Sequence, residues 1–138
     1  MTRANLNFVF QSFIFPREGE TSTTLYHYHN GDQYPSGLRD CYHIEELLKD
    51  LTPEGFKKWI RKNYDAKAVG ISHPCIYYDQ FGFITDYSYI FEEERGYIDQ
   101  SGKRVSFPNI RVYNWDELIF SGTTEEFRKW LKGRKKFE

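Results

Sequence analysis

The sequence predicts an α+β fold in which a mostly antiparallel sheet carries two central helices and a C-terminal helix packed on one face. Short segments with strand-like alternation of apolar residues flank a helical middle, and the connections between them are tight. Aromatic residues make up 19% of the 138 residues, and rings of this size can build a core although only 39% of the chain is hydrophobic. The length fits one compact domain over residues 1–138.

The first elements are predicted to form a β-hairpin. Residues 6–15 carry apolar groups on both faces, which is typical of a central strand covered above and below. A turn over residues 16–22 leads to a second strand at 23–29. Residues 30–37 contain nearly every turn-forming residue type and are predicted to be a loop.

Two helices are expected next. Apolar residues recur at helical spacing across residues 41–51, so this segment is predicted to be one amphipathic helix. Thr52 is a suitable N-cap for the second helix, and Pro53 suits its first position. The apolar stripe of this second helix consists of Phe56, Trp59 and Ile60.

The second half of the chain is predicted to be mostly strands. Alternating apolar residues and turn signals place them at residues 75–78, 81–92, 97–99, 104–107, 110–115 and 118–120. Thr123 and Glu126 have the spacing of a capping box and open the terminal helix. The buried stripe of this helix is predicted to be Phe127, Trp130 and Leu131.

The composition excludes several broad functions. With 19 basic and 20 acidic residues the net charge is −1, so no global field draws the chain to nucleic acid or to a membrane. There is no apolar run of about 18 residues and no secretory signal pattern, and two cysteines favour a reducing compartment, so we expect a cytoplasmic protein without membrane contact. No phosphate-binding or dinucleotide motif is present, so no cofactor is predicted and binding is favoured over catalysis.

The histidines and cysteines suggest two metal sites. They occur in pairs whose two members are separated by one intervening residue. Two of these pairs, Cys41 with His43 and His73 with Cys75, would together complete a tetrahedral zinc site. A one-residue gap on a helix splays side chains apart, and Cys41 lies on an apolar stripe, so ordinary packing is the favoured interpretation. A second set, His27, His29 and Asp32, supports the alternative of a metal-dependent hydrolase or nuclease.

Two basic helices support another alternative, a nucleic-acid-binding module. Residues 53–64 and 123–136 are both predicted to be helical, and both place basic residues around a tryptophan. Because each tryptophan falls on the apolar stripe, solvated lysine faces are the simpler interpretation. Adjacency of the two helices in the fold would favour nucleic-acid binding.

The loop after the second strand carries the binding hypothesis that we favour. Loops on a rigid scaffold concentrate binding groups, and Tyr and Arg dominate the energetics of interfaces. We expect non-catalytic binding of a host protein or a small anionic ligand, and exposed strand edges that allow a homodimer. The candidate binding residues are His27, His29, Asp32, Tyr34 and Arg39, with Arg111 and Tyr113 as outer members.

Two segments resemble uncharacterised small phage and prophage accessory proteins. Residues 25–38 are similar to their motif of a Tyr-x-His strand end followed by an Asp-Gly-Tyr-Pro-like turn, and residues 110–131 are similar to their tails. Together the segments cover about a quarter of the chain, and Asp32-Gln33-Tyr34-Pro35 departs from the motif. The resemblance implies a phage-encoded protein in the host cytoplasm that blocks a defence protein, such as a CRISPR-Cas component.

Overall fold

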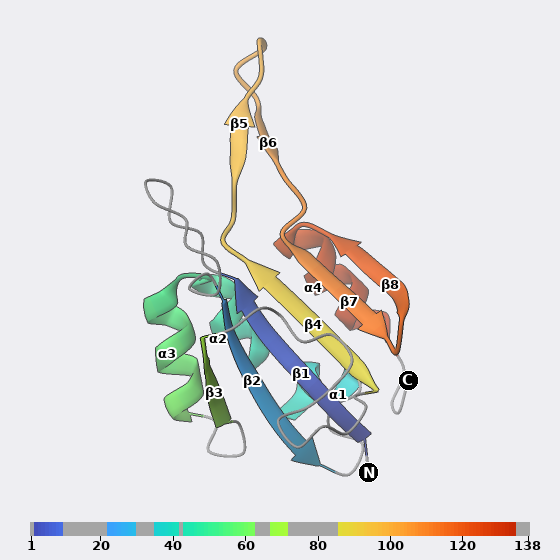
Figure 1. The fold of residues 1–138 in the computed structure, drawn as a ribbon. Coiled ribbons are helices and arrows are strands. Elements are labelled where there is room, and N and C mark those ends of the chain that lie inside the picture. Colours follow the sequence, from blue (N-terminus) through green and yellow to red (C-terminus); the bar gives the residue numbers. More distant parts are fainter. Residues whose placement is uncertain are drawn as a thin grey trace.

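A six-stranded sheet with the order β3-β2-β1-β4-β7-β8 forms the frame of the protein (Figure 1). The computed structural model describes residues 2–9, 22–29, 35–41, 43–62, 67–71 and 86–134. The strands of the sheet are β1 (Thr2–Val9), β2 (Ser22–His29), β3 (Lys67–Ile71), β4 (Tyr87–Glu92), β7 (Ile110–Asn114) and β8 (Glu117–Gly122). Only the β1–β4 pair is parallel, so the predicted mostly antiparallel sheet is confirmed.

The predicted N-terminal hairpin is present, but its first strand begins at Thr2, before the predicted residue 6, and its second at Ser22, within the predicted turn. β1 pairs antiparallel with β2, from Thr2 opposite His29 to Val9 opposite Ser22, and it pairs with β4 on its other side. β1 is therefore central, as its apolar pattern predicts. The expectations for residues 10–21, 30–34, 72–85 and 135–136 and for the side chain of Ile60 lie outside the described part of the chain.

The helical region differs from the prediction in two ways. Pro35 begins helix α1 (Pro35–Cys41), so the end of the expected 30–37 loop is helical, with proline at the first position where it costs no hydrogen bond. The single helix expected over 41–51 is wrong: α1 ends at Cys41, and α2 (Ile44–Lys49) begins after His43, whose φ of 50° is left-handed. Apolar spacing continues across this break and therefore conceals it.

The third helix and the terminal helix follow the prediction. In α3 (Pro53–Lys62), Oγ1 of Thr52 accepts a hydrogen bond from the Gly55 N–H at 3.1 Å, as an N-cap does. In α4 (Thr124–Lys132), the capping box is complete, because Thr123 and Glu126 each accept a hydrogen bond from the other's backbone N–H.

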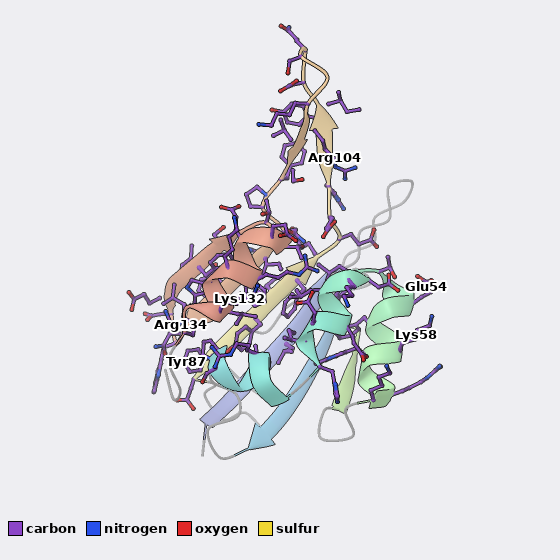
Figure 2. All side chains as sticks on the ribbon, turned by 180° about the vertical axis from the view of Figure 1, so that it is seen from behind. Glu54, Lys58, Tyr87, Arg104, Lys132 and Arg134 are labelled. Carbon is purple, nitrogen blue, oxygen red and sulfur yellow. The ribbon has the colours of Figure 1, made fainter. Side chains whose placement is uncertain are left out.

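The core lies between the helices and one face of the sheet (Figures 1 and 2). Alternate residues of β1, β4 and β7 supply its sheet side, and every helix contributes buried residues. Its fully buried large side chains are Phe8, Phe56, Trp59, Tyr89, Phe91 and Phe127. Aromatic rings therefore fill the core, as the composition predicts.

One strand of the sheet was not expected. β3 forms an edge of the sheet by pairing antiparallel with β2, and this pairing is irregular between Thr24 and Leu25. This segment, Lys-Ala-Val-Gly-Ile, is only five residues long, and its Lys, Ala and Gly are depleted in strands. Local propensity therefore does not predict this element.

Candidate functional site

A two-stranded arm projects from one end of the sheet (Figure 1). It consists of residues 95–107 and contains β5 (Gly96–Ile98) and β6 (Arg104–Ser106), the hairpin that turn signals predict. The three ladder positions pair Gly96 with Ser106, Tyr97 with Val105 and Ile98 with Arg104. This hairpin forms its own two-stranded sheet and projects beyond the six-stranded sheet (Figure 1).

The arm exposes large apolar side chains. Tyr97 is 51% exposed, Ile98 73% and Phe107 49%, and none of them belongs to the hydrophobic core. The rings of Tyr97 and Phe107 lie 5.5 Å apart between centroids, which orders both side chains without covering them. Single exposed apolar residues are common on proteins, but this short projection carries three. Tyr97 and Phe107 contact each other, and Ile98, the next residue of β5 after Tyr97, points to the opposite face of the hairpin. Such a concentration of apolar side chains is typical of interaction surfaces.

The tip of the arm is held by one carboxylate. Oδ1 of Asp99 accepts hydrogen bonds from the Ser101 hydroxyl at 2.6 Å, the Ser101 N–H at 2.9 Å and the Lys103 N–H at 3.0 Å. These donors, the Ser101 hydroxyl first among them, lower the pKa of Asp99 below its usual 3.8. Gly102 follows with a φ of 84°, a conformation that favours glycine. The tip is thus an ordered turn.

The base of the arm is tied to both the sheet and α4. The buried Asn109 donates from Nδ2 to the Glu92 carbonyl oxygen at 3.1 Å and to Oγ1 of Thr124 at 3.0 Å. Backbone hydrogen bonds join Phe107 to Arg95 and Glu92 to Asn109, each at 2.8 Å. The arm therefore leaves the domain in a defined direction.

Gly96 permits the close approach of the two strands. A Cβ atom at this position would lie 2.4 Å from the carbonyl oxygen of Val105, which is a backbone atom that cannot rotate away. The sequence pattern predicts only that Gly96 marks a turn. The structure shows that Gly96 also lets β5 and β6 approach each other closely.

The residues of the predicted binding loop are only partly described. His27 and His29 lie in β2, opposite Ala4 and Thr2 of β1, and Asp32 and Tyr34 lie outside the described residues. Nothing in the structure therefore tests whether this group forms a site.

Arg39 has a structural contact that its sequence position does not reveal. It lies in α1, is partly buried, and donates from Nη1 to the carbonyl oxygens of Leu131 at 3.2 Å and Arg134 at 2.8 Å. A cation at the end of a helix interacts favourably with its carbonyl groups, so Arg39 caps the C-terminal end of α4.

The outer candidates lie on the other side of the sheet from Arg39. Arg111 is exposed and Tyr113 half-buried on β7, and they alternate with Ile110 and Val112, which face the helices. The structure therefore places Arg111 and Tyr113 on the face of the sheet opposite the helices that it describes, and it does not bring them to Arg39.

The metal candidates are also divided. Cys41 ends α1 and His43 is exposed between helices, whereas His73 and Cys75 fall outside the described part of the chain. Within the residues that the structure describes, no group of three or more His, Cys, Asp or Glu side chains is placed to hold a metal ion.

The two basic helices are not neighbours. α2 contacts α3 and also forms an ion pair with α4, so α2 lies between the basic residues of α3 and those of α4 (Figures 1 and 2). Part of their charge is paired, because Lys62 lies 2.7 Å from a carboxylate oxygen of Glu46 and Arg128 contacts Glu45 at 2.8 Å. The acidic side chains of Glu45 and Glu46 therefore lie between the basic residues of α3 and α4.

Comparison with known proteins identified no relative: no family model matches this sequence, and no curated protein or solved structure is significantly similar. In the described part of the chain, no helix has the length and apolar character needed to cross a membrane.

Proposed function

We propose that this protein acts by non-catalytic binding of a partner protein and that the β5–β6 arm makes the contact. The exposed apolar side chains of Tyr97, Ile98 and Phe107 carry this proposal. Aromatic side chains are enriched among the residues that dominate protein interfaces, and Tyr97 presents such a ring on an ordered projection.

The shape of the arm favours a protein over a small ligand. Small molecules bind in concave pockets that bury most of their surface, whereas the arm projects outward (Figure 1). We expect the hairpin to insert into a groove of another protein, so that the apolar side chains on both faces of the hairpin are removed from water. Because Asp99 and Asn109 already order the tip and the base, less conformational entropy is lost on binding.

The setting of this binding comes from the sequence resemblance. We propose a phage-encoded accessory protein in the cytoplasm of the host, where the arm would occupy a surface that a defence protein needs. Neither the metal-dependent hydrolase nor the nucleic-acid-binding hypothesis gains support from the geometry of the described residues.

The test compares the wild-type protein with the triple variant Tyr97→Thr, Ile98→Thr, Phe107→Thr. Threonine keeps a high strand propensity, so the arm is retained while its apolar surface is removed. Each protein is expressed with an affinity tag in bacterial cells, and the co-purifying proteins are quantified by mass spectrometry. We expect a partner whose recovery falls at least about tenfold with the triple variant, which corresponds to roughly 1.4 kcal/mol of binding free energy.

The control is Ser121→Thr, which changes an exposed strand residue outside the arm and outside the other candidate sites. Equal recovery of every co-purifying protein with the wild type and the triple variant would contradict the proposal. A native mass spectrum of the purified wild type, recorded before any chelator is added, separates the alternatives. One bound metal ion per chain would favour the hydrolase hypothesis.

A further inference from the structure

The turn between β7 and β8 carries a tryptophan in an unusual conformation. Asn114 pairs with Glu117, so Trp115 and Asp116 form a two-residue turn. Trp115 has a φ of 56°, in the left-handed region where a Cβ atom is disfavoured. Two-residue hairpin turns normally place Gly, Asn or Asp at such a position.

The backbone N–H of Trp115 donates to the carbonyl oxygen of Asp86 at 3.0 Å and so holds the turn, but side-chain packing does not account for a tryptophan here. Its side chain is 53% exposed, and Leu118 close by on β8 is 49% exposed. By contrast, Trp59 is buried in the core, and Trp130 packs against Phe120 and Phe127. The chain therefore holds its largest side chain type on the surface, at a position where glycine would be less strained. Strain that the surrounding packing does not explain is most often found at functional sites.

The charges beside Trp115 indicate what it contacts. Asp116 and Glu117 follow it directly, and both are exposed. An indole ring also stacks on nucleic-acid bases, but these carboxylates repel phosphate groups and so disfavour that partner. They complement lysine or arginine side chains around an apolar pocket.

We infer that the Trp115 turn is an anchoring site for a partner protein that presents an apolar pocket rimmed by basic side chains. Trp115 fills the pocket with Leu118 beside it, and the Asp116 and Glu117 carboxylates meet the rim. The turn follows the end of β7 opposite to the arm (Figure 1). This second site therefore stands independently of the arm's function.

The binding test uses a library of random peptides displayed on phage. Peptides are selected on the wild-type protein after depletion on the variant Trp115→Gly, and the enriched sequences are synthesised with a fluorescent label. We expect them to combine apolar residues with Lys or Arg, to bind Trp115→Gly at least about tenfold more weakly, and to lose affinity as salt is added.

The triple arm variant Tyr97→Thr, Ile98→Thr, Phe107→Thr is the control, and these peptides should bind it as they bind the wild type. A failure of the arm proposal thus leaves this result unchanged. The inference is overturned if no Trp115-dependent peptide is enriched, or if the enriched peptides lack basic residues.

A stability measurement tests the same inference without a partner. If Trp115 is retained for binding, Trp115→Gly melts at or above the wild-type temperature, because glycine adopts the left-handed conformation without strain. Trp115→Ala loses the indole but keeps the strain, so it should melt below Trp115→Gly. A melting temperature of Trp115→Gly more than about 5 °C below wild type would show a structural role and overturn the inference.

Discussion

The side-chain amide of Asn109 donates a hydrogen bond to the hydroxyl of Thr124 at 3.0 Å, and this contact joins the base of the arm to the first residue of α4. The same amide donates to the carbonyl oxygen of Glu92 at the end of β4. One buried side chain thus connects the two chain segments at the base of the arm with the helix that packs beside them.

Replacing Asn109 tests this connection. Asn109→Ala leaves the Glu92 carbonyl and the Thr124 hydroxyl without this donor in a buried site, so we expect the free energy of unfolding to fall by about 1–3 kcal/mol. Urea denaturation measures the change. Ser121→Ala, at an exposed position, should stay within about 0.5 kcal/mol of wild type. A loss at Asn109 no larger than that of this control would contradict the prediction.

Replacing Gly96 should open the arm without unfolding the domain. In Gly96→Ala the new Cβ would lie 2.4 Å from the Val105 carbonyl oxygen, so the two strands must separate. We expect faster hydrogen–deuterium exchange in β5 and β6, while global stability changes little because the arm's side chains lie outside the core.

The control for Gly96 is Gly133→Ala, whose Cβ would lie 3.6 Å from the nearest atom, an ordinary contact. Its arm should exchange as in wild type. Unchanged exchange in Gly96→Ala would show that the arm tolerates a side chain at this position.

Replacing Arg39 distinguishes a structural role from a binding role. Arg39→Ala removes a charged donor from the carbonyl oxygens of Leu131 and Arg134, so we expect a loss of about 1.5–3 kcal/mol in the free energy of unfolding. Arg111→Ala, at an exposed position on β7, is the control and should change stability by less than about 0.5 kcal/mol. Unchanged stability in Arg39→Ala would return Arg39 to the group of binding candidates.

The arm should loosen at acidic pH through Asp99. Because the pKa of Asp99 lies below its usual 3.8, the folded tip favours the carboxylate form. Its stabilisation is therefore fully present above pH 3.8 and is lost as the pH falls through the lowered pKa. NMR titration should show the amide signals of Ser101 and Lys103 moving together below pH 3.8, as Asp99 becomes protonated.

Asp99→Asn removes the titrating group and should abolish this shared transition. A transition centred above pH 3.8, or one that persists in Asp99→Asn, would show that another group controls the tip.

The agreement between prediction and structure depends on whether a feature is local. The capping box of Thr123 and Glu126 and the N-cap at Thr52 are contacts within one helical turn, and both were predicted correctly. The break at His43 was missed, because the apolar spacing on either side is compatible with one continuous helix. The edge strand at Lys67–Ile71 was missed because its pairing with β2 is a long-range contact.

The same distinction applies to the candidate surfaces. The sequence predicts the hairpins around Gly102 and around Asn114–Glu117, but it does not show that Tyr97, Ile98, Phe107 and Trp115 lie outside the core. Residue type alone suggests burial for each of them. Likewise, the sequence suggests that Arg39 is a binding residue. In the structure its guanidinium group instead donates to carbonyl oxygens at the C-terminal end of α4.

By itself, the sequence determined the α+β class, the aromatic core, the hairpins and the starts of α3 and α4, since these follow from apolar periodicity and from contacts between near neighbours in the chain. Only the tertiary structure decided the strand order, the separation of α3 from α4, and which aromatic residues are left without a core to cover them. The physical reason is that burial depends on what the rest of the chain places against a side chain, and no local pattern contains that information.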